Sequence, residues 1–170
     1  KPIILVLNEG RGRIIRSFVD DMDAVLHAYI PGREGGRALA SILYGDVNPS
    51  GRTPISFPRS VGHSPCYYNH KKSFANCYKK HGSYENPGRD YVFSTPGALY
   101  PFGHGLSYTT FEYSNPTIKT EADLFKLTVT VKNTGKYAGK EAVQVYVTAP
   151  ESKMEKPVKE LKAFAKTREL

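Results

Sequence analysis

The chain has 170 residues, of which 39% are hydrophobic and 24% charged, and this balance excludes disordered and membrane-embedded classes. No apolar run approaches the roughly 20 residues that a bilayer-crossing helix needs, so we expect no membrane partner. The net charge of +8 invites a nucleic-acid interpretation. However, the densest basic segment, 71–81, is typical of a solvated loop and no groove-reading motif is present, so we expect no nucleic-acid partner.

The first part of the chain, to about residue 58, has an α/β pattern. The apolar run Ile3–Leu7 predicts a strand buried on both faces of a parallel sheet. The glycines within 8–12 then allow a tight turn. Apolar residues recur at helical spacing over 14–22, which predicts a short amphipathic helix.

A second strand and a second helix follow. Ala24–Tyr29 predicts a strand that Pro31-Gly32 ends, and Glu34–Tyr44 predicts a helix whose acidic first residue suits its positive end. The stretch 46–51 has turn chemistry, and 54–57 is a short extended segment. Strands alternating with helices indicate a parallel sheet with helices on its faces.

The remaining chain changes character twice. Residues 59–108 show no sustained period and are rich in tyrosine, which favours an ordered connector over a flexible linker. From Phe111 onward the pattern is all-β, with alternating runs over 127–132 and 143–148 that suggest antiparallel strands separated by a glycine-containing loop. Leu161–Leu170 is a third β segment.

Both ends suggest that the chain is part of something longer. It opens with Lys1-Pro2 instead of Met, and its three or four β segments make at most half of a β-sandwich. We therefore expect both regions to be incomplete.

Cysteines and histidines give no metal-site pattern. Cys66 and Cys77 are the two cysteines, too few for a disulfide framework or a four-ligand zinc site. A single local disulfide and two free thiols both remain open. The five histidines show no metal-ligand spacing, so we expect no metal and no cofactor.

Several ordered motifs carry a family resemblance across nearly the whole chain. PGREGG at 31–36, followed by ALASILYGDVNPSGR at 38–52, resembles the signature of glycoside hydrolase family 3. SFPRSVG at 56–62 and YYNHK at 67–71 resemble the next blocks of the bacterial β-glucosidase branch. LYPFGHGLSYTTF at 99–111 resembles the family's LYPFGYGLSYTTF, with His104 where a tyrosine is usual. VTVKNTG at 129–135 and KPVKELKAF at 156–164 resemble its fibronectin type III-like domain. Gly12 departs from the family, where a proline is common.

The resemblance implies a parent with an N-terminal barrel, an α/β sandwich and a fibronectin type III-like domain. Residues 1–108 would be the C-terminal part of the sandwich with its connector, and 109–170 the N-terminal part of the last domain. The implied activity is retaining, exo-acting hydrolysis of β-linked sugars, most similar to β-glucosidases of the bacterial periplasmic branch. The implied partners are a β-linked oligosaccharide or glucoside and the barrel domain, and the implied location is periplasmic or secreted. A β-xylosidase parent and a non-catalytic carbohydrate-binding or structural module are the alternatives.

A retaining glycosidase needs two carboxyl groups about 5 Å apart. The resemblance implies that both precede this chain, so we expect no catalytic residue within it. Five residues are candidates for substrate binding: Glu9, Tyr67, Tyr68, Asn69 and His70. Glu9 follows a parallel strand, where ligands gather, and the others combine aromatic faces with amide and imidazole groups suited to sugars. Capping or loop packing is the structural alternative for all five.

Overall fold

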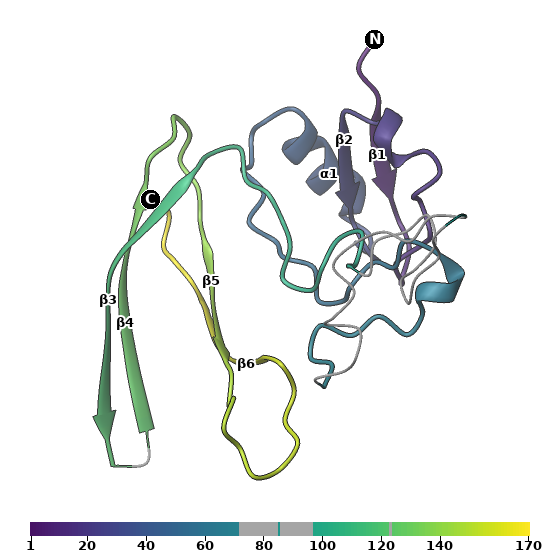
Figure 1. Ribbon diagram of the computed structural model, residues 1–170. Coiled ribbons are helices and arrows are strands. Elements are labelled where there is room, and N and C mark those ends of the chain that lie inside the picture. Colours follow the sequence, from purple (N-terminus) through teal and green to yellow (C-terminus); the bar gives the residue numbers. More distant parts are fainter. Residues whose placement is uncertain (72–84, 86–96, 123) are drawn as a thin grey trace.

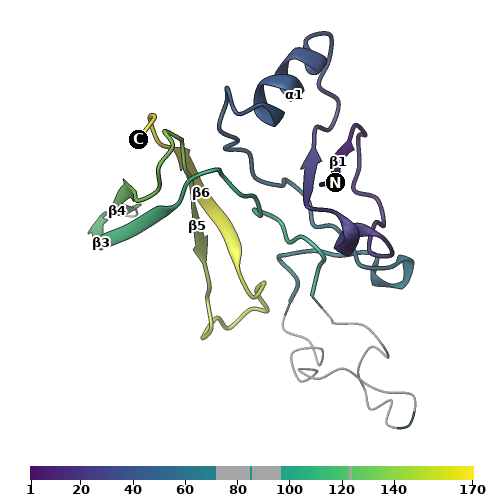
Figure 2. The same ribbon diagram turned by 90° about the horizontal axis from the view of Figure 1, so that it is seen from above.

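The computed structural model describes residues 1–71, 85, 97–122 and 124–170. Two regions lie side by side, an α/β region and a β region of two hairpins. The segment that precedes β3 connects them (Figures 1 and 2). An α/β part followed by an all-β part is the fold class that the sequence predicts. In the described part of the chain, no helix is long and apolar enough to cross a membrane.

The α/β region is built on two parallel strands. β1 (Ile4–Leu7) pairs with β2 (Ala24–His27) in register, with Leu7 beside His27. α1 (Gly35–Leu43) follows, with Glu34 at its N-cap as expected, although that side chain makes no capping hydrogen bond. The predicted strands and the second helix are therefore confirmed, each shortened by one or two residues at its ends.

Two predictions about this region are wrong. The helix expected over 14–22 is only a 3₁₀ turn, η1 (Val19–Asp21), since Ile15 and Val19 reach the core through a tight bend in which both amides of Phe18 and Val19 donate to the Ile15 carbonyl. Asp20 and Asp21 near the end of the segment disfavour a helix, because acidic residues at a helix C-terminus oppose its dipole. β1 is also not buried on both faces: Ile4 and Val6 are exposed, because the described sheet has two strands.

The β region consists of two separate antiparallel hairpins. β3 (Phe111–Glu121) pairs with β4 (Leu124–Asn133), and β5 (Ala142–Val147) pairs with β6 (Glu160–Lys166). The expected strands are present, but β4 and β5 belong to different two-stranded sheets instead of pairing with each other. The register of β3 shifts between Ser114 and Thr117, at Pro116, because proline cannot donate to the ladder.

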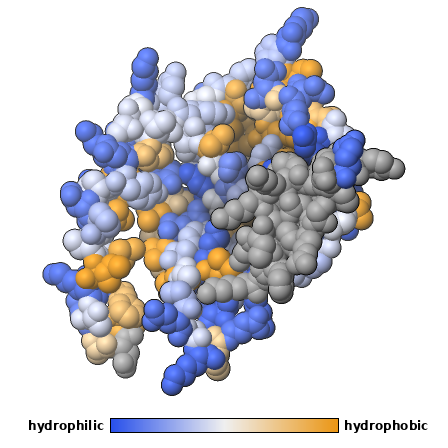
Figure 3. Space-filling model, viewed as in Figure 1, coloured by the Kyte–Doolittle hydropathy of each residue, from blue (hydrophilic) through white to orange (hydrophobic). Residues whose placement is uncertain are grey.

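The hairpins expose much of their apolar surface. Figure 3 shows orange apolar side chains on the outside of this region, and Ile118, Leu124, Phe125 and Phe164 are all exposed. Within the described residues, the buried hydrophobic side chains are Ile15, Val19 and Phe57, all in the α/β region. The β region therefore has no core of its own among the described residues.

A polar network joins the two regions. Arg52 donates to the Glu141 carboxylate at 2.6 Å, and the Tyr113 hydroxyl donates to the other oxygen of Glu141 at 2.8 Å. Glu141 is buried, and the pKa of Tyr113 is raised to about 12 by burial of its hydroxyl and then by the hydrogen bond to, and charge of, the Glu141 carboxylate. Gln144 adds a contact to this network, which forms the seam between the two regions, by donating to the Gly103 carbonyl at 3.0 Å. The buried Arg52–Glu141 ion pair and the Tyr113 hydrogen bond thus fix the loop after α1 to the start of β5 and to β3.

Candidate functional site at the carboxyl edge of the parallel strands

The carboxyl ends of β1 and β2 bring three polar residues together. Glu9 follows β1 by two residues, His27 is the last residue of β2, and Tyr29 comes two residues later. The Ala28 amide donates to the Leu7 carbonyl at 2.8 Å, which extends the pairing to this edge. Tyr29 turns the chain with a φ of 55°, a left-handed conformation that an L-residue adopts at some cost in strain. The edge is where ligands collect in parallel sheets.

The three side chains pack closely. One Glu9 oxygen accepts from Nε of Arg13 at 2.6 Å, and the other lies 3.9 Å from Nε2 of His27. The His27 ring meets the Tyr29 ring edge-on, with centroids 3.9 Å apart, and the Phe57 ring at 5.1 Å. The His27 side chain is only 9% exposed. An acid, an imidazole and a phenol therefore share one half-enclosed edge.

Much of the hydrogen-bonding capacity at this edge is unused within the described residues. Glu9 Oε1, both ring nitrogens of His27 and the Tyr29 hydroxyl are buried, and none makes a hydrogen bond of normal geometry there, although the Arg11 backbone lies near the His27 ring. Leaving a buried polar group unpaired costs about 1–3 kcal/mol. The carboxylate oxygen can accept, the phenol can donate, and the imidazole can do either. The edge is thus equipped to hold a group that both donates and accepts, such as a sugar hydroxyl.

Burial sets the protonation of the cluster. It lowers the pKa of His27, against the opposing effects of the Glu9 charge and the Arg11 backbone, so His27 is neutral at pH 7. Burial also raises the pKa of Tyr29, which keeps its hydroxyl protonated. A neutral imidazole at 3.9 Å from a carboxylate is not an ion pair, so the edge offers a neutral imidazole and a neutral phenol beside the Glu9 carboxylate.

Aromatic rings continue from the edge toward the β region. Phe57 is fully buried and bridges to Tyr100, with ring centroids 5.9 Å apart. Tyr100 stacks on His104 at 5.3 Å, and burial and the Arg52 charge both lower the pKa of His104. His104 therefore serves as a flat stacking partner for Tyr100.

The other four predicted residues lie apart from Glu9. Tyr68 stacks on Phe102 at 4.1 Å, meets Tyr146 edge-on at 5.9 Å, and its hydroxyl accepts from the Leu161 amide at 3.3 Å. That residue packs the connector against the β region. Tyr67, Asn69 and His70 are exposed.

Within the described residues, no hydrogen bond, ion pair or ring contact joins Tyr67, Tyr68, Asn69 or His70 to Glu9. A role for them in sugar binding stays a prediction. Sequence reasoning missed His27 and Tyr29 as members of the site. The available signal was their position at the end of the second parallel strand, beside the strand that leads to Glu9.

Metal and disulfide chemistry add nothing to this edge. Among the residues that the structure describes, no group of three or more His, Cys, Asp or Glu side chains could hold a metal ion. Cys66 has a free thiol whose pKa is raised by burial. Cys77 lies outside the described residues.

The fold defines a two-part protein, an α/β region with a polar strand edge followed by a β region of two antiparallel hairpins. A family model described as the glycosyl hydrolase family 3 C-terminal domain matches residues 1–108, and a model of the fibronectin type III-like domain matches residues 141–170. The chain belongs to glycosyl hydrolase family 3.

Known relatives extend this result. A periplasmic beta-glucosidase of Salmonella typhimurium is 42% identical over 98% of this chain and 22% of its own length. A putative beta-xylosidase of Formosa agariphila is 38% identical over 98% of this chain and 21% of its own. The crystal structure of a beta-glucosidase from Listeria innocua in complex with isofagomine superposes with a TM-score of 0.82 at 37% identity, over 98% of this chain and 24% of the other. The chain spans about a fifth to a quarter of the length of these relatives.

Proposed function

We propose that this chain is the C-terminal part of a retaining, exo-acting β-glycosidase that removes terminal β-linked glucose from oligosaccharides. The observation that supports this most strongly is family membership, with relatives named as β-glucosidases matching 98% of the chain. Residues 1–108 would form the end of the α/β sandwich with its connector, and 109–170 the beginning of the fibronectin type III-like domain. The name of the Salmonella relative supports a periplasmic or secreted location.

The catalytic carboxylates belong, in this proposal, to segments outside the chain. A retaining enzyme needs a nucleophile and an acid/base about 5 Å apart. Within residues 1–71, 85, 97–122 and 124–170, the carboxylate best placed for a ligand is Glu9, and it is engaged by Arg13 at 2.6 Å. We assign Glu9 to positioning, together with His27 and Tyr29, at the face that meets the substrate or the barrel domain.

One alternative function is favoured by a specific observation. A β-xylosidase is favoured by the relative from Formosa agariphila, which matches as much of the chain as the Salmonella enzyme does. Xylose differs from glucose by the missing hydroxymethyl group, and such a small difference in a pocket changes selectivity by about 1–3 kcal/mol. A non-catalytic carbohydrate-binding or structural module is the other alternative.

Steady-state hydrolysis by the longest protein that contains this chain tests the proposal. We expect kcat/KM for an aryl β-glucoside to exceed that for the matching β-xyloside at least tenfold. The reverse preference would replace the proposed activity with that of a β-xylosidase. If the folded protein hydrolysed neither the glucoside nor the xyloside, the non-catalytic module would be the remaining alternative.

The same assay tests the strand edge. We expect Glu9→Gln to lower kcat/KM at least tenfold, because the amide both weakens the bond to Arg13 and places a donor where the edge offers an acceptor. Glu112→Gln, a change on an exposed strand residue of β3, is the matched control and should leave kcat/KM unchanged. Equal kcat/KM values for Glu9→Gln and Glu112→Gln would show that Glu9 takes no part in the site.

A further inference from the structure

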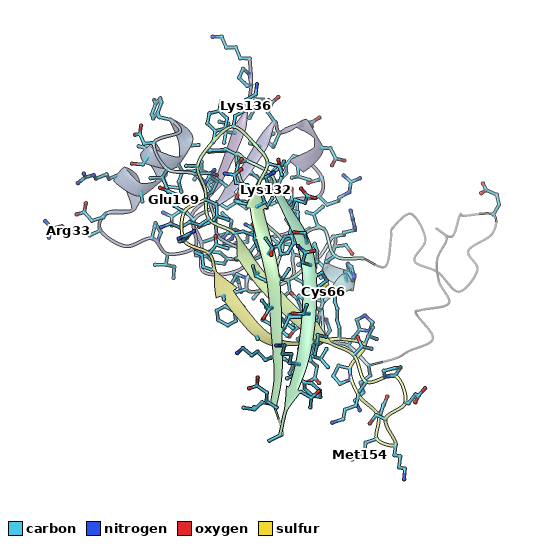
Figure 4. All side chains as sticks on the ribbon, turned by 90° about the vertical axis from the view of Figure 1, so that its left-hand side faces the viewer. Arg33, Cys66, Lys132, Lys136, Met154 and Glu169 are labelled. Atoms are coloured by element: carbon cyan, nitrogen blue, oxygen red, sulfur yellow. The ribbon has the colours of Figure 1, made fainter. Side chains whose placement is uncertain are left out.

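A cleft lies at the seam between the α/β region and the β region. The loop that follows α1 forms one wall, and the β4–β5 loop with the end of the chain forms the other, enclosing a cleft of about 1050 Å³. Figure 4 shows Glu169, one of the lining residues, on the returning C-terminal segment. The cleft is at the upper end of the size that small-molecule sites have, so it has room for more than one pyranose ring.

The two walls are held at a fixed separation. The side chain of Asn48 donates to the Ala138 carbonyl at 2.9 Å and accepts from the Tyr108 amide at 2.8 Å. Gly139 packs so closely that a Cβ there would come within 2.6 Å of the Asn48 side chain. Gly139 also exchanges two backbone hydrogen bonds with Leu170, at 3.1 and 2.9 Å, which closes the far end. The cleft is therefore preformed.

Three tyrosines from three different segments line this cleft. Tyr44 at the end of α1 is 86% exposed, Tyr137 in the β4–β5 loop is 63% exposed, and Tyr108 before β3 is 46% exposed. The Tyr108 hydroxyl donates to the Ile42 carbonyl at 2.8 Å, which fixes that ring. Tyrosine combines a large aromatic face with a polar tip, and several such faces gathered in one cleft are suited to cover a ligand.

The polar residues beside these rings carry both charges. Asp46, Lys140 and Glu169 line the cleft, and no hydrogen bond or ion pair involves their side chains in the described part of the chain. Two carboxylates with one ammonium repel a polyanion such as nucleic acid and give no net attraction to a simple anion. They suit a neutral polyhydroxyl compound, since the carboxylates accept from hydroxyls and the ammonium donates to them.

We propose that this cleft binds a neutral oligosaccharide, with Tyr44 and Tyr137 as the stacking platforms for sugar rings and with Asp46, Lys140 and Glu169 bonding their hydroxyls. The expectation that the sugar is β-linked glucose rests on the proposed function. The cleft itself rests on the aromatic and polar residues described above and does not require that function.

Calorimetric titration of the 170-residue chain with laminari- and cello-hexaose tests the proposal. We expect saturable binding that weakens at least fivefold in Tyr44→Ala and in Tyr137→Ala, and that weakens further in the double variant. Phe125→Ala, which removes an equally exposed aromatic ring from the β3–β4 hairpin, is the matched control and should bind like the parent chain. Both tyrosines are exposed, so their replacement is not expected to disturb packing. Thermal unfolding curves that match that of the parent chain will establish that the variants are folded.

Three outcomes would overturn the proposal: no binding of any neutral oligosaccharide by the folded chain, unchanged binding in the double tyrosine variant, or loss of this binding when the chain is part of the longer protein. A parallel titration with xylo-hexaose separates this proposal from the previous one. Tyrosine-dependent binding of xylo-hexaose alone would support the cleft while contradicting the choice of β-linked glucose.

Discussion

Removing the carboxylate of Glu141 is expected to lower the free energy of unfolding by about 3–5 kcal/mol, measured by urea denaturation followed by circular dichroism. The reason is that Glu141→Ala removes the carboxylate partner of Arg52 at 2.6 Å, which leaves that guanidinium only its bond to the Gly51 carbonyl, and the acceptor of the Tyr113 hydroxyl at 2.8 Å. A buried charge without its partner cannot recover its lost hydration. The ion pair also crosses the seam, so its loss weakens the contact between the two regions.

Two companion variants separate this effect from the general cost of losing an ion pair. Glu155→Ala removes a pair of similar length, Lys71–Glu155 at 2.8 Å, but both side chains are exposed, so the expected loss is below about 1 kcal/mol. Glu141→Gln keeps an acceptor and should fall between the two. Because Glu141 helps raise the pKa of Tyr113 to about 12, Glu141→Gln should also move tyrosinate formation of one residue toward its ordinary value near pH 10. Equal losses for Glu141→Ala and Glu155→Ala would contradict the seam as described.

The second large effect is expected at Gly105, within the motif over 99–111. A Cβ at this position would lie 2.4 Å from the carbonyl oxygen of Gly51 and 3.0 Å from Cδ of Arg52. The nearest atom belongs to the backbone and cannot rotate away, so Gly105→Ala must move one of two loops that the seam holds together. We expect a loss of about 1–3 kcal/mol or more in the free energy of unfolding.

Gly36→Ala is the control for this substitution. Gly36 lies in α1 and a Cβ there meets nothing within 4 Å, so the change should stabilise the helix by up to about 1 kcal/mol. Denaturation of both variants under the same conditions gives the comparison. A neutral Gly105→Ala would show that these two loops do not approach as closely as the structure has them.

The sequence predicted the local elements well because their signals are local. The apolar run at 3–7, the amphipathic pattern over 34–44 and the strict alternation over 127–132 each encode a strand or helix that the structure contains. The apolar spacing over 14–22 predicted a helix wrongly, because Ile15 and Val19 can be buried by a bend as well as by a helix. Periodicity reports which side chains are buried and not which backbone buries them.

Strand pairing and the polar contacts could not be predicted from the sequence, because they depend on residues far apart in the chain. The alternation in β4 and β5 is equally consistent with either partner, and the choice of β3 and β6 depends on long-range contacts. The Arg52–Glu141 pair joins residues 89 positions apart. Glu9 could be singled out because it follows a strand, but its approach to within 3.9 Å of His27 depends on the parallel pairing of β1 with β2.

The most direct test of the central claim is hydrolysis of an aryl β-glucoside by the isolated 170-residue chain, compared with the longest protein that contains it, with thermal unfolding recorded for both. We predict turnover only in the longer protein, because the proposed nucleophile and acid/base lie on segments that the isolated chain does not contain. Turnover by the isolated, folded chain would contradict this prediction and would place a catalytic carboxylate pair within residues 1–170.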